Sequence, residues 1–302
     1  MKRKLRKKLK NAVYVAVVSF VGFILVQLGI VDSAVTTQTA GYPVVLQQAG
    51  DTVSVISTGQ ADSALIFSGG KFCLIDAGET YDGHIGVVEY LRKAGVKEIE
   101  LVVITHFHYD HTSELIDVID NFKVNNIVIP DLSLQNVPTA DYFTVFLDKV
   151  EYRNINLKPA SKGDEYKVGN GTLKILADTY NDLTANDTSV ATLFTQGEFT
   201  YLSTGDGEAE YEKRLLKDFN DSVTLFVAGH HGSQDSNTEE FIKTIRPQFV
   251  AISAGKDNDY GHPHKKVTDM FDSMKIPYAV TANQGTIVYS ITENKLLKNN
   301  VS

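Results

Sequence analysis

One short segment of the chain places four potential metal ligands within six residues. It reads Thr105-His106-Phe107-His108-Tyr109-Asp110-His111, and the apolar run Leu101–Ile104 precedes it directly. A short apolar run of this kind is typical of a buried strand, so the ligand-type side chains gather at the carboxyl end of a strand. Imidazole and carboxylate groups suit Zn²⁺, and also Mn²⁺ or Fe. If these side chains bind a metal ion, the fold must leave this end of the strand open so that ligands from other segments can reach it. A solvated histidine-rich turn is the alternative.

Two later segments carry further ligand-type residues after predicted strands. Asp206 ends the run Tyr201-Leu202-Ser203-Thr204-Gly205-Asp206, where a carboxylate at a glycine turn can bridge two metal ions. His230 and His231 follow the predicted strand Val223–Ala228. Neighbouring side chains of an extended chain point to opposite sides. We therefore expect only one of these two histidines to bind metal, and the other to orient a ligand or contact substrate.

The order of predicted elements indicates an α+β fold. Short β-prone runs with glycine turns come first and predict antiparallel strands: Thr52–Ser57, Ser63–Phe67 and Lys71–Asp76. Further predicted strands are Asn126–Pro130, Tyr166–Val168, Leu173–Leu176, Ser189–Thr195, Thr200–Ser203, Phe249–Ser253, Tyr278–Thr281 and Thr286–Ile291. Predicted helices are His84–Ala94, Glu114–Phe122, Ala140–Tyr152, Glu208–Phe219, Thr238–Ile245 and His264–Met274. This alternation predicts two packed sheets flanked by helices.

The amino terminus predicts a membrane anchor. Residues 1–10 carry five Lys, two Arg and no acid, and Ala12–Val31 is uncharged. As a helix with a rise of ~1.5 Å per residue, this apolar run would span roughly 30 Å, the thickness of a bilayer core. Because flanking cations stay cytoplasmic, we expect a single-pass protein of the cell membrane, with residues 1–10 as a basic cytoplasmic tail, 32–50 as a linker and 51–295 as an extracytoplasmic domain. A cleaved signal peptide, which would leave the protein secreted, and a buried core helix are the alternatives.

Charge and cysteine content exclude other classes of protein. The basic tail accounts for 7 of the 29 Lys and Arg residues, so residues 11–302 sum to 22 − 37 = −15. A body this acidic does not favour general nucleic-acid binding, which depends on neutralising phosphates. Cys73 is the single cysteine. It allows neither an internal disulfide nor a thiolate-rich metal site.

Together these segments resemble the metallo-β-lactamase superfamily. Four stretches occur in the order seen in that superfamily: Leu74-Ile75-Asp76-Ala77-Gly78, His106–His111, Thr204-Gly205-Asp206 and Gly229-His230-His231-Gly232-Ser233. More narrowly, the chain is similar to the extracytoplasmic hydrolase-like domain associated with the competence protein ComEC. The stretches that carry this similarity are 57–63, 186–189 and 253–264. The resemblance covers residues 51–292 and implies an αββα sandwich with a metal site at one edge of the sheets.

The resemblance also implies roles for individual residues. It implies metal binding by His106, His108, Asp110, His111 and Asp206, with His230 or His231 as the later histidine ligand. Asp76 would support the cluster from a neighbouring strand. The histidine that the superfamily usually places between the cluster and the bridging acid is missing, because no histidine lies between His111 and His230. Asp187 or Asn186 is expected to replace it, and weak binding of one of the two metal ions is the alternative. We expect two zinc ions, with Mn²⁺ or Fe as alternatives.

The implied reaction is metal-assisted hydrolysis. Two metal ions ~3.5–4 Å apart would lower the pKa of a bridging water and hold the attacking and leaving oxygens. Asp110 would bind metal or hold the resulting hydroxide, and His262 and His264 would bind the oxyanion or protonate the leaving group. Lys256 and Tyr260 would contact phosphate. The alternative for these last four residues is a loop of solvated polar groups.

The expected substrate is an extracellular phosphodiester, either DNA or an envelope polymer such as choline-decorated teichoic acid. The similarity to ComEC-like domains and the outward location favour it, although fold analogy alone does not choose a substrate. A degenerate, non-catalytic module that binds nucleic acid or an envelope partner is the second hypothesis. Lactone or β-lactam hydrolysis is the third. We expect membrane contact through the one N-terminal helix and no obligate protein partner.

Overall fold

The computed structural model describes residues 50–79, 84–131, 140–177 and 184–297. The predicted basic tail and membrane anchor, and all but the last residue of the linker, lie outside these described residues. Within the described ranges, no helix is both long enough and apolar enough to cross a bilayer.

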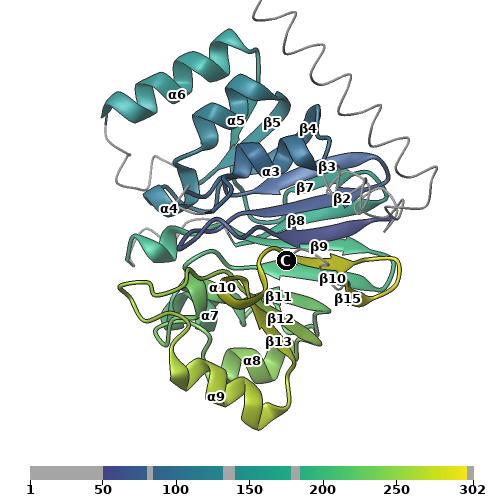
Figure 1. Ribbon diagram of the computed structural model, residues 1–302, viewed down its shortest axis with the longest axis vertical. Coiled ribbons are helices and arrows are strands. Elements are labelled where there is room, and N and C mark those ends of the chain that lie inside the picture. The colour runs from purple at the N-terminus through teal and green to yellow at the C-terminus, as the bar shows by residue number, and fades with distance from the viewer. Residues whose placement is uncertain (1–49, 80–83, 132–139, 178–183, 298–302) are drawn as a thin grey trace, which may run out of the picture. The chain divides into compact units, whose positions relative to one another are not determined.

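Two mixed sheets form the centre of the body (Figure 1). The first has the strand order β15-β14-β1-β2-β3-β4-β5-β6. Its strands are β1 (Thr52–Val55), β2 (Ala64–Ser68), β3 (Lys71–Ile75), β4 (Glu98–Val103), β5 (Lys123–Ile129), β6 (Asn156–Pro159), β14 (Ile287–Ser290) and β15 (Lys295–Leu297). The pairs from β15 to β3 are antiparallel, and those from β3 to β6 are parallel.

The second sheet repeats this division into an antiparallel and a parallel half. Its order is β13-β12-β11-β10-β9-β8-β7. The strands are β7 (Glu165–Val168), β8 (Gly171–Ala177), β9 (Ala191–Gln196), β10 (Phe199–Ser203), β11 (Leu225–Val227), β12 (Phe249–Ile252) and β13 (Tyr278–Val280). Strands β10 to β13 are parallel. The carboxyl ends of neighbouring parallel strands meet at one edge of a sheet, where α/β proteins commonly bind ligands.

Helices cover the outer faces of both sheets (Figure 1). Helices α3 (Val87–Lys93), α5 (Leu115–Asn121) and α6 (Ala140–Tyr152) lie over the first sheet. Helices α7 (Ala209–Leu215), α8 (Glu239–Ile245) and α9 (Lys265–Met274) pack on the second. Two helices of a single turn, α4 (Tyr109–Thr112) and α10 (Thr281–Gln284), complete the body. The predicted αββα sandwich is confirmed.

The alternation of side chains along the strands builds this layering. In β10, Tyr201 packs between the two sheets, whereas Leu202 packs under the helices of the second sheet. In β11, Leu225 and Val227 face the first sheet and Phe226 faces the helices. Since successive residues of a strand point to opposite faces, strands covered on both sides must be apolar almost throughout.

Two strands and the two single-turn helices, α4 and α10, were not predicted. Strands β6 and β15 are the outermost strands of the first sheet, and most of their residues are exposed or only partly buried. Edge strands pair on one side only and so carry a weaker hydrophobic signal. The single turn α10 occupies the stretch that the sequence assigned to the end of one strand and the connection to the next.

Candidate metal centre

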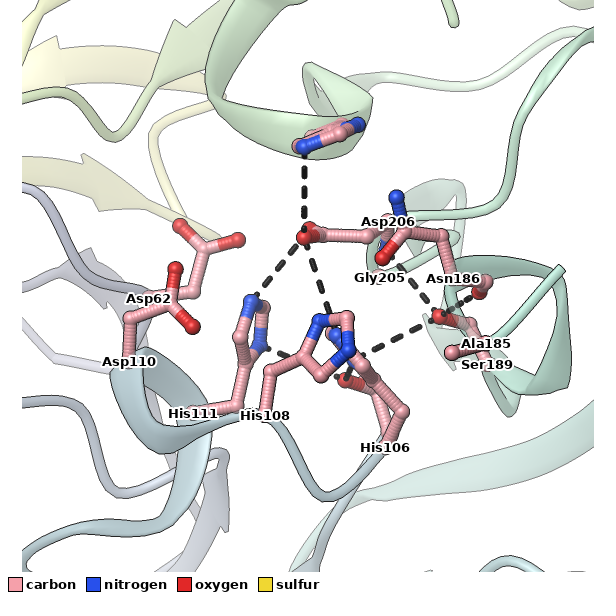
Figure 2. Close-up of polar contacts among 12 residues, drawn as sticks. Asp62, His106, His108, Asp110, His111, Ala185, Asn186, Ser189, Gly205 and Asp206 are labelled. Carbon is pink, nitrogen blue, oxygen red and sulfur yellow. Dashed lines mark hydrogen bonds and ion pairs between the residues drawn. The ribbon is translucent and has the colours of Figure 1, made fainter. Parts of the chain in front are cut away.

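Loops that follow strands of both sheets bring two groups of potential metal ligands together. Figure 2 labels Asp62, His106, His108, His111 and Asp206 of these groups. One group consists of Asp62, His111, Asp206 and His231, and the other of His106, His108 and Asp206. Within each group, the ligand atoms lie within 4.8 Å of one another. Asp206 belongs to both groups. Each group could hold a metal ion, and the two groups share one carboxylate.

The buried polar atoms at the centre fit bound divalent cations. His106 Nε2, His111 Nε2, Asp206 Oδ1 and Asp62 Oδ1 are buried and make no well-aligned hydrogen bond among the described residues, where their contacts are ion pairs of 3.3 to 3.7 Å with other members of the ligand groups. A buried polar atom without a partner is costly, and four such atoms converge here. His111 Nε2 lies 3.3 Å from Asp206 Oδ1, and His106 Nε2 lies 3.7 Å from Asp206 Oδ2. Imidazole nitrogen and carboxylate oxygen are ligands for Zn²⁺, Mn²⁺ and Fe.

The glycine turn before Asp206 allows it to approach the histidine cluster closely. Gly205 has a φ of 54°, and a Cβ at this position would lie 2.7 Å from Ser189 Oγ and 2.9 Å from Thr105 Cβ. Only glycine combines this backbone conformation with so close a contact. The backbone N–H of Asp206 donates to Ser189 Oγ at 3.0 Å. This turn therefore places the Asp206 carboxylate between His106 and His111 (Figure 2).

Asp76, at the end of β3, orients His111. One of its oxygens accepts the Thr105 backbone N–H at 2.8 Å, and the other lies 2.7 Å from the Thr105 hydroxyl and 2.8 Å from His111 Nδ1. A carboxylate in this position holds the proton on Nδ1 and leaves Nε2 for a metal. The structure thus places Asp76 behind His111, as a support for the cluster.

The backbone at His230 and His231 is left-handed, and the expected extended chain is wrong. These residues have φ and ψ of 51° and 50°, and of 54° and 25°. The two side chains consequently reach the same site. His231 Nε2 lies 3.1 Å from Asp110 Oδ2, and His230 Nε2 lies 3.8 Å from Asp206 Oδ2. Of the pair, only His231 belongs to one of the two ligand groups.

The Asn237 side chain holds this left-handed turn. Its Oδ1 accepts the Gly229 N–H at 3.0 Å, and its Nδ2 donates to the carbonyls of Gly229 at 2.9 Å and Ser233 at 3.0 Å. The Asn237 backbone N–H donates in turn to Glu212 Oε1 at 2.6 Å. Left-handed conformations of residues other than glycine cost about 1–2 kcal/mol each. This network offsets the cost at His230 and His231.

Glu212, which accepts the Asn237 backbone N–H, makes the free energy of unfolding depend on pH. It is fully buried on α7, and burial raises the pKa of its carboxyl to about 7, although hydrogen bonds from Thr238 and Asn237 oppose the rise. A carboxyl whose pKa is higher in the folded state retains a proton that the unfolded chain has lost. We therefore expect the free energy of unfolding to fall by about 3 kcal/mol as the pH rises from about 4.5 to about 7.

Denaturant unfolding of Glu212→Gln and of the wild-type chain across this pH range measures the effect. The difference between the two unfolding free energies should change by the stated amount, because glutamine does not titrate. Glu198→Gln, at an exposed turn position, is the matched control and should follow the wild-type profile. Parallel profiles for wild type and Glu212→Gln would contradict the expectation.

Asn186, and not Asp187, faces the site where the superfamily's additional histidine was expected. Asp187 Oδ1 accepts the Glu208 backbone N–H at 2.8 Å, and its Oδ2 accepts the Thr184 hydroxyl at 2.9 Å. Asn186 lines the cavity at the site, and its Oδ1 is buried without a hydrogen-bond partner among the described residues. The structure therefore does not bring Asp187 among the metal ligands.

Asp62 is the ligand-type residue that sequence reasoning missed. It lies in the loop between β1 and β2 and is buried, and its backbone N–H donates to the Asp110 carbonyl at 3.0 Å. The stretch 57–63 supported the resemblance, but no spacing connects it to the histidine cluster. Asp110, which was expected to bind metal, is in neither ligand group and lies beside His231 instead.

The charges of the ligand side chains depend on one another. Burial disfavours a charge on His111, but the carboxylates of Asp206 and Asp76 raise its pKa well above the ordinary value. Burial would likewise raise the pKa of Asp206, but His111 and His106 hold it well below the usual range. Burial lowers the pKa of His106, and the neighbouring His111 lowers it further. Positive charge at this position thus stabilises the Asp206 carboxylate, as a bound cation would.

A cavity of about 340 Å³ opens onto the ligand groups. Its lining residues are Gln60, His108, Tyr109, Asp110, Asn186, Asp206, His230, His231, Tyr260 and His262. Gln60 Nε2 lies 3.3 Å from His262 Nδ1, and burial lowers the pKa of His262 to about 4. His264 and Lys256 are not among the lining residues. His264 Nδ1 accepts the Gln234 backbone N–H at 2.9 Å, and Lys256 is exposed.

Known proteins resemble this chain in sequence and in fold. "ComE operon protein 3" of Bacillus subtilis (strain 168) is 28% identical over 257 residues, which are 78% of this chain and 32% of that protein. "Recombination protein 2" of Haemophilus influenzae is 24% identical over 250 residues, which are 81% of this chain and 29% of that protein. The chain thus spans about a third of the length of these curated relatives. They are competence proteins of the ComEC type.

Solved structures support the fold alone, because their sequence identities are low. CmlA, a diiron β-hydroxylase from Streptomyces venezuelae, has a TM-score of 0.57 at 14% identity, covering 80% of this chain and 54% of that one. The metallo-β-lactamase fold protein YhfI from Bacillus subtilis has a TM-score of 0.52 at 13% identity, covering 76% of this chain and 96% of that one. Residues 56–255 match the family described as the metallo-β-lactamase superfamily. This match spans most of the chain, which therefore belongs to the metallo-β-lactamase superfamily.

Proposed function

We propose that this chain is a metal-dependent phosphodiesterase. The observation that carries the proposal is the pair of ligand groups sharing Asp206 beside an open cavity. Metal ions bound there would lower the pKa of a coordinated water and offset the negative charge that develops on a phosphate. Zinc is the expected metal, and the histidine and carboxylate ligands also suit Mn²⁺ or Fe.

His262 is placed to donate a hydrogen bond to the substrate. The Gln60 amide donates to His262 Nδ1, so the ring carries its proton on Nε2. That N–H can bind a phosphate oxygen or the leaving oxygen in the cavity. Asp110 is only partly buried, and its carboxylate can accept a hydrogen bond from the attacking water. These roles refine the catalytic assignments that the sequence suggested for both residues.

No Lys or Arg is among the described residues that line the cavity. The cavity would therefore bind a phosphate group without cationic side chains. The charge of the substrate would be balanced by the metal ions and by the imidazole N–H groups. Curated relatives named as competence and recombination proteins favour a nucleic-acid phosphodiester over a lactone or a β-lactam. We place the reaction outside the cell membrane, on the strength of the basic tail and the apolar run that follows it.

A substrate panel on the purified full-length chain, loaded with Zn²⁺ or Mn²⁺, tests the proposal. We expect cleavage of bis-(p-nitrophenyl) phosphate, with no turnover of a lactone or a chromogenic cephalosporin. His108→Ala should lower kcat/KM roughly a hundredfold or more. Replacing even a residue that only supports a metal ligand typically costs 10–100-fold in metal affinity or activity, and His108 is a candidate ligand itself. His84→Ala is the matched control, since His84 is absent from the ligand groups and from the cavity lining.

The other outcomes identify the competing hypotheses. A metal-free and inactive protein would favour the non-catalytic module. Turnover of the cephalosporin or the lactone without phosphodiester cleavage would favour the third hypothesis. Recovery of the same full-length protein from the soluble fraction of cells, and not from the membrane fraction, would count against the anchor.

A further inference from the structure

Two exposed tyrosines stand at the cavity that opens onto the ligand groups. In the described part of the chain, five large hydrophobic side chains are exposed, and three of them lie on α6. The other two are Tyr109 and Tyr260, each 68% exposed, and both line this cavity. Scattered exposed apolar residues need no explanation. Two exposed aromatic rings on one cavity beside the ligand groups, in contrast, do need an explanation.

The two tyrosines come from loops that follow different sheets. Tyr109 is the first residue of α4, which is the next helix after β4 of the first sheet. Tyr260 lies in the loop after β12 of the second sheet. The Asn258 side chain shapes that loop, because its Oδ1 accepts the backbone N–H groups of Tyr260 at 3.2 Å and His262 at 3.0 Å. The backbone at Tyr260 is thus held in position before any ligand binds.

Tyr260 continues a series of nearly parallel rings that begins at the ligand groups. The rings of His231 and His262 lie 6.0 Å apart at 27°, and those of His262 and Tyr260 lie 5.8 Å apart at 20°. Exposure rises along the series, from 2% at His231 through 9% at His262 to 68% at Tyr260. The outermost ring has most of its surface in solvent. A further flat ring can stack there and extend the series.

We propose that Tyr109 and Tyr260 form an aromatic subsite that binds a nucleobase of the substrate beside the reacting phosphate. The proposal rests on the proposed phosphodiesterase function and names the substrate class as nucleoside phosphodiesters. Every nucleobase has a π-face, so the subsite tolerates all base sequences. Stacking also supplies affinity that a cavity without Lys or Arg does not obtain from phosphate contacts.

A pair of esters with the same leaving group tests the subsite on the metal-loaded full-length chain. Thymidine 5′-(p-nitrophenyl phosphate) carries a base, and methyl p-nitrophenyl phosphate does not. We expect kcat/KM to be higher for the thymidine ester. The ratio of the two values should fall roughly five- to hundredfold in Tyr109→Leu and in Tyr260→Leu, because stacking on an aromatic ring is lost. Tyr109→Phe and Tyr260→Phe keep the ring and should keep most of the ratio.

Binding of thymidine 5′-phosphate provides a second readout that does not require turnover. Calorimetry should show weaker binding to both leucine variants and near-wild-type binding to both phenylalanine variants. Tyr152→Leu is the matched control, since Tyr152 is 82% exposed on α6 and is not among the cavity lining residues. It should leave the ratio and the binding unchanged.

The two proposals fail in different ways. Equal kcat/KM for the two esters, or a ratio that the leucine variants do not change, overturns the subsite and leaves the phosphodiesterase standing. No cleavage of either ester, with tyrosine-dependent binding of thymidine 5′-phosphate, overturns the phosphodiesterase and supports the subsite. Tighter binding of choline phosphate than of thymidine 5′-phosphate would identify a cage for quaternary ammonium groups and would overturn the nucleobase proposal.

Discussion

Replacing Asp206 by asparagine is expected to remove both metal positions and to lower kcat/KM for phosphodiesters by about 10³-fold or more. Among the described residues, this carboxylate is the member common to the two ligand groups, so its loss takes a ligand from each. Metal ions contribute several kcal/mol of transition-state stabilisation. Each 1.36 kcal/mol corresponds to a factor of about ten in rate. Asparagine preserves the shape of the side chain and removes its charge.

Elemental analysis of dialysed protein, together with phosphodiester kinetics, measures this effect. Asp221→Asn makes the same chemical change at an exposed position, and it should retain the metal content and turnover of the wild-type chain. Far-ultraviolet circular dichroism of both variants separates lost ligation from lost folding. An Asp206→Asn protein that keeps two equivalents of metal and wild-type kinetics would show that the shared carboxylate does not bind metal.

Replacing Asp62 by asparagine is expected to empty one metal position and leave the other filled. Asp62 belongs only to the group with His111 and His231, and its Oδ1 is buried without a hydrogen-bond partner among the described residues. The group formed by His106, His108 and Asp206 does not include it. We expect one equivalent of metal to be lost and hydrolysis to fall by about a hundredfold or more, because replacing even a residue that only supports a metal ligand typically costs 10–100-fold in metal affinity or activity.

Titration against a chromogenic chelator resolves this outcome, because it counts tight and weak equivalents separately. Asp221→Asn again controls for the loss of one negative charge, and it should bind two equivalents tightly. Retention of both equivalents in Asp62→Asn would show that Asp62 serves the fold and not the metal. Loss of both would show that the two positions cannot be filled independently.

Local patterns in the sequence were sufficient to predict the layered fold and most of the strand ends that carry the site. The cluster at His106–His111, the glycine turn before Asp206 and the paired histidines each come within a few residues of the end of a predicted strand. A strand that ends in ligand-type residues is visible within ten residues of sequence. Parallel strands align their carboxyl ends at one edge of a sheet, but the resemblance to the superfamily was what assigned the separate motifs to one centre.

The remaining features depend on contacts between distant segments. Asp62 has no spacing that links it to the cluster, and it reaches the site because its loop bonds to the Asp110 backbone. The left-handed turn at His230 and His231 depends on Asn237, whose amide satisfies three backbone groups. Asp187 is turned away because Thr184 and the Glu208 backbone engage both of its oxygens. None of these contacts has a signature in a local pattern.

The division of the ligands between the two sheets has a consequence for the folding of the newly synthesised chain. Asp62 and the histidine cluster follow strands of the first sheet, whereas Asp206 and His231 follow strands of the second. A nascent chain that stops short of residue 231 lacks part of the ligand set, so the group of Asp62, His111, Asp206 and His231 cannot form until that residue has been added. Both ligand groups are complete only when the two sheets have packed together, and a bound metal ion would then link segments of both sheets.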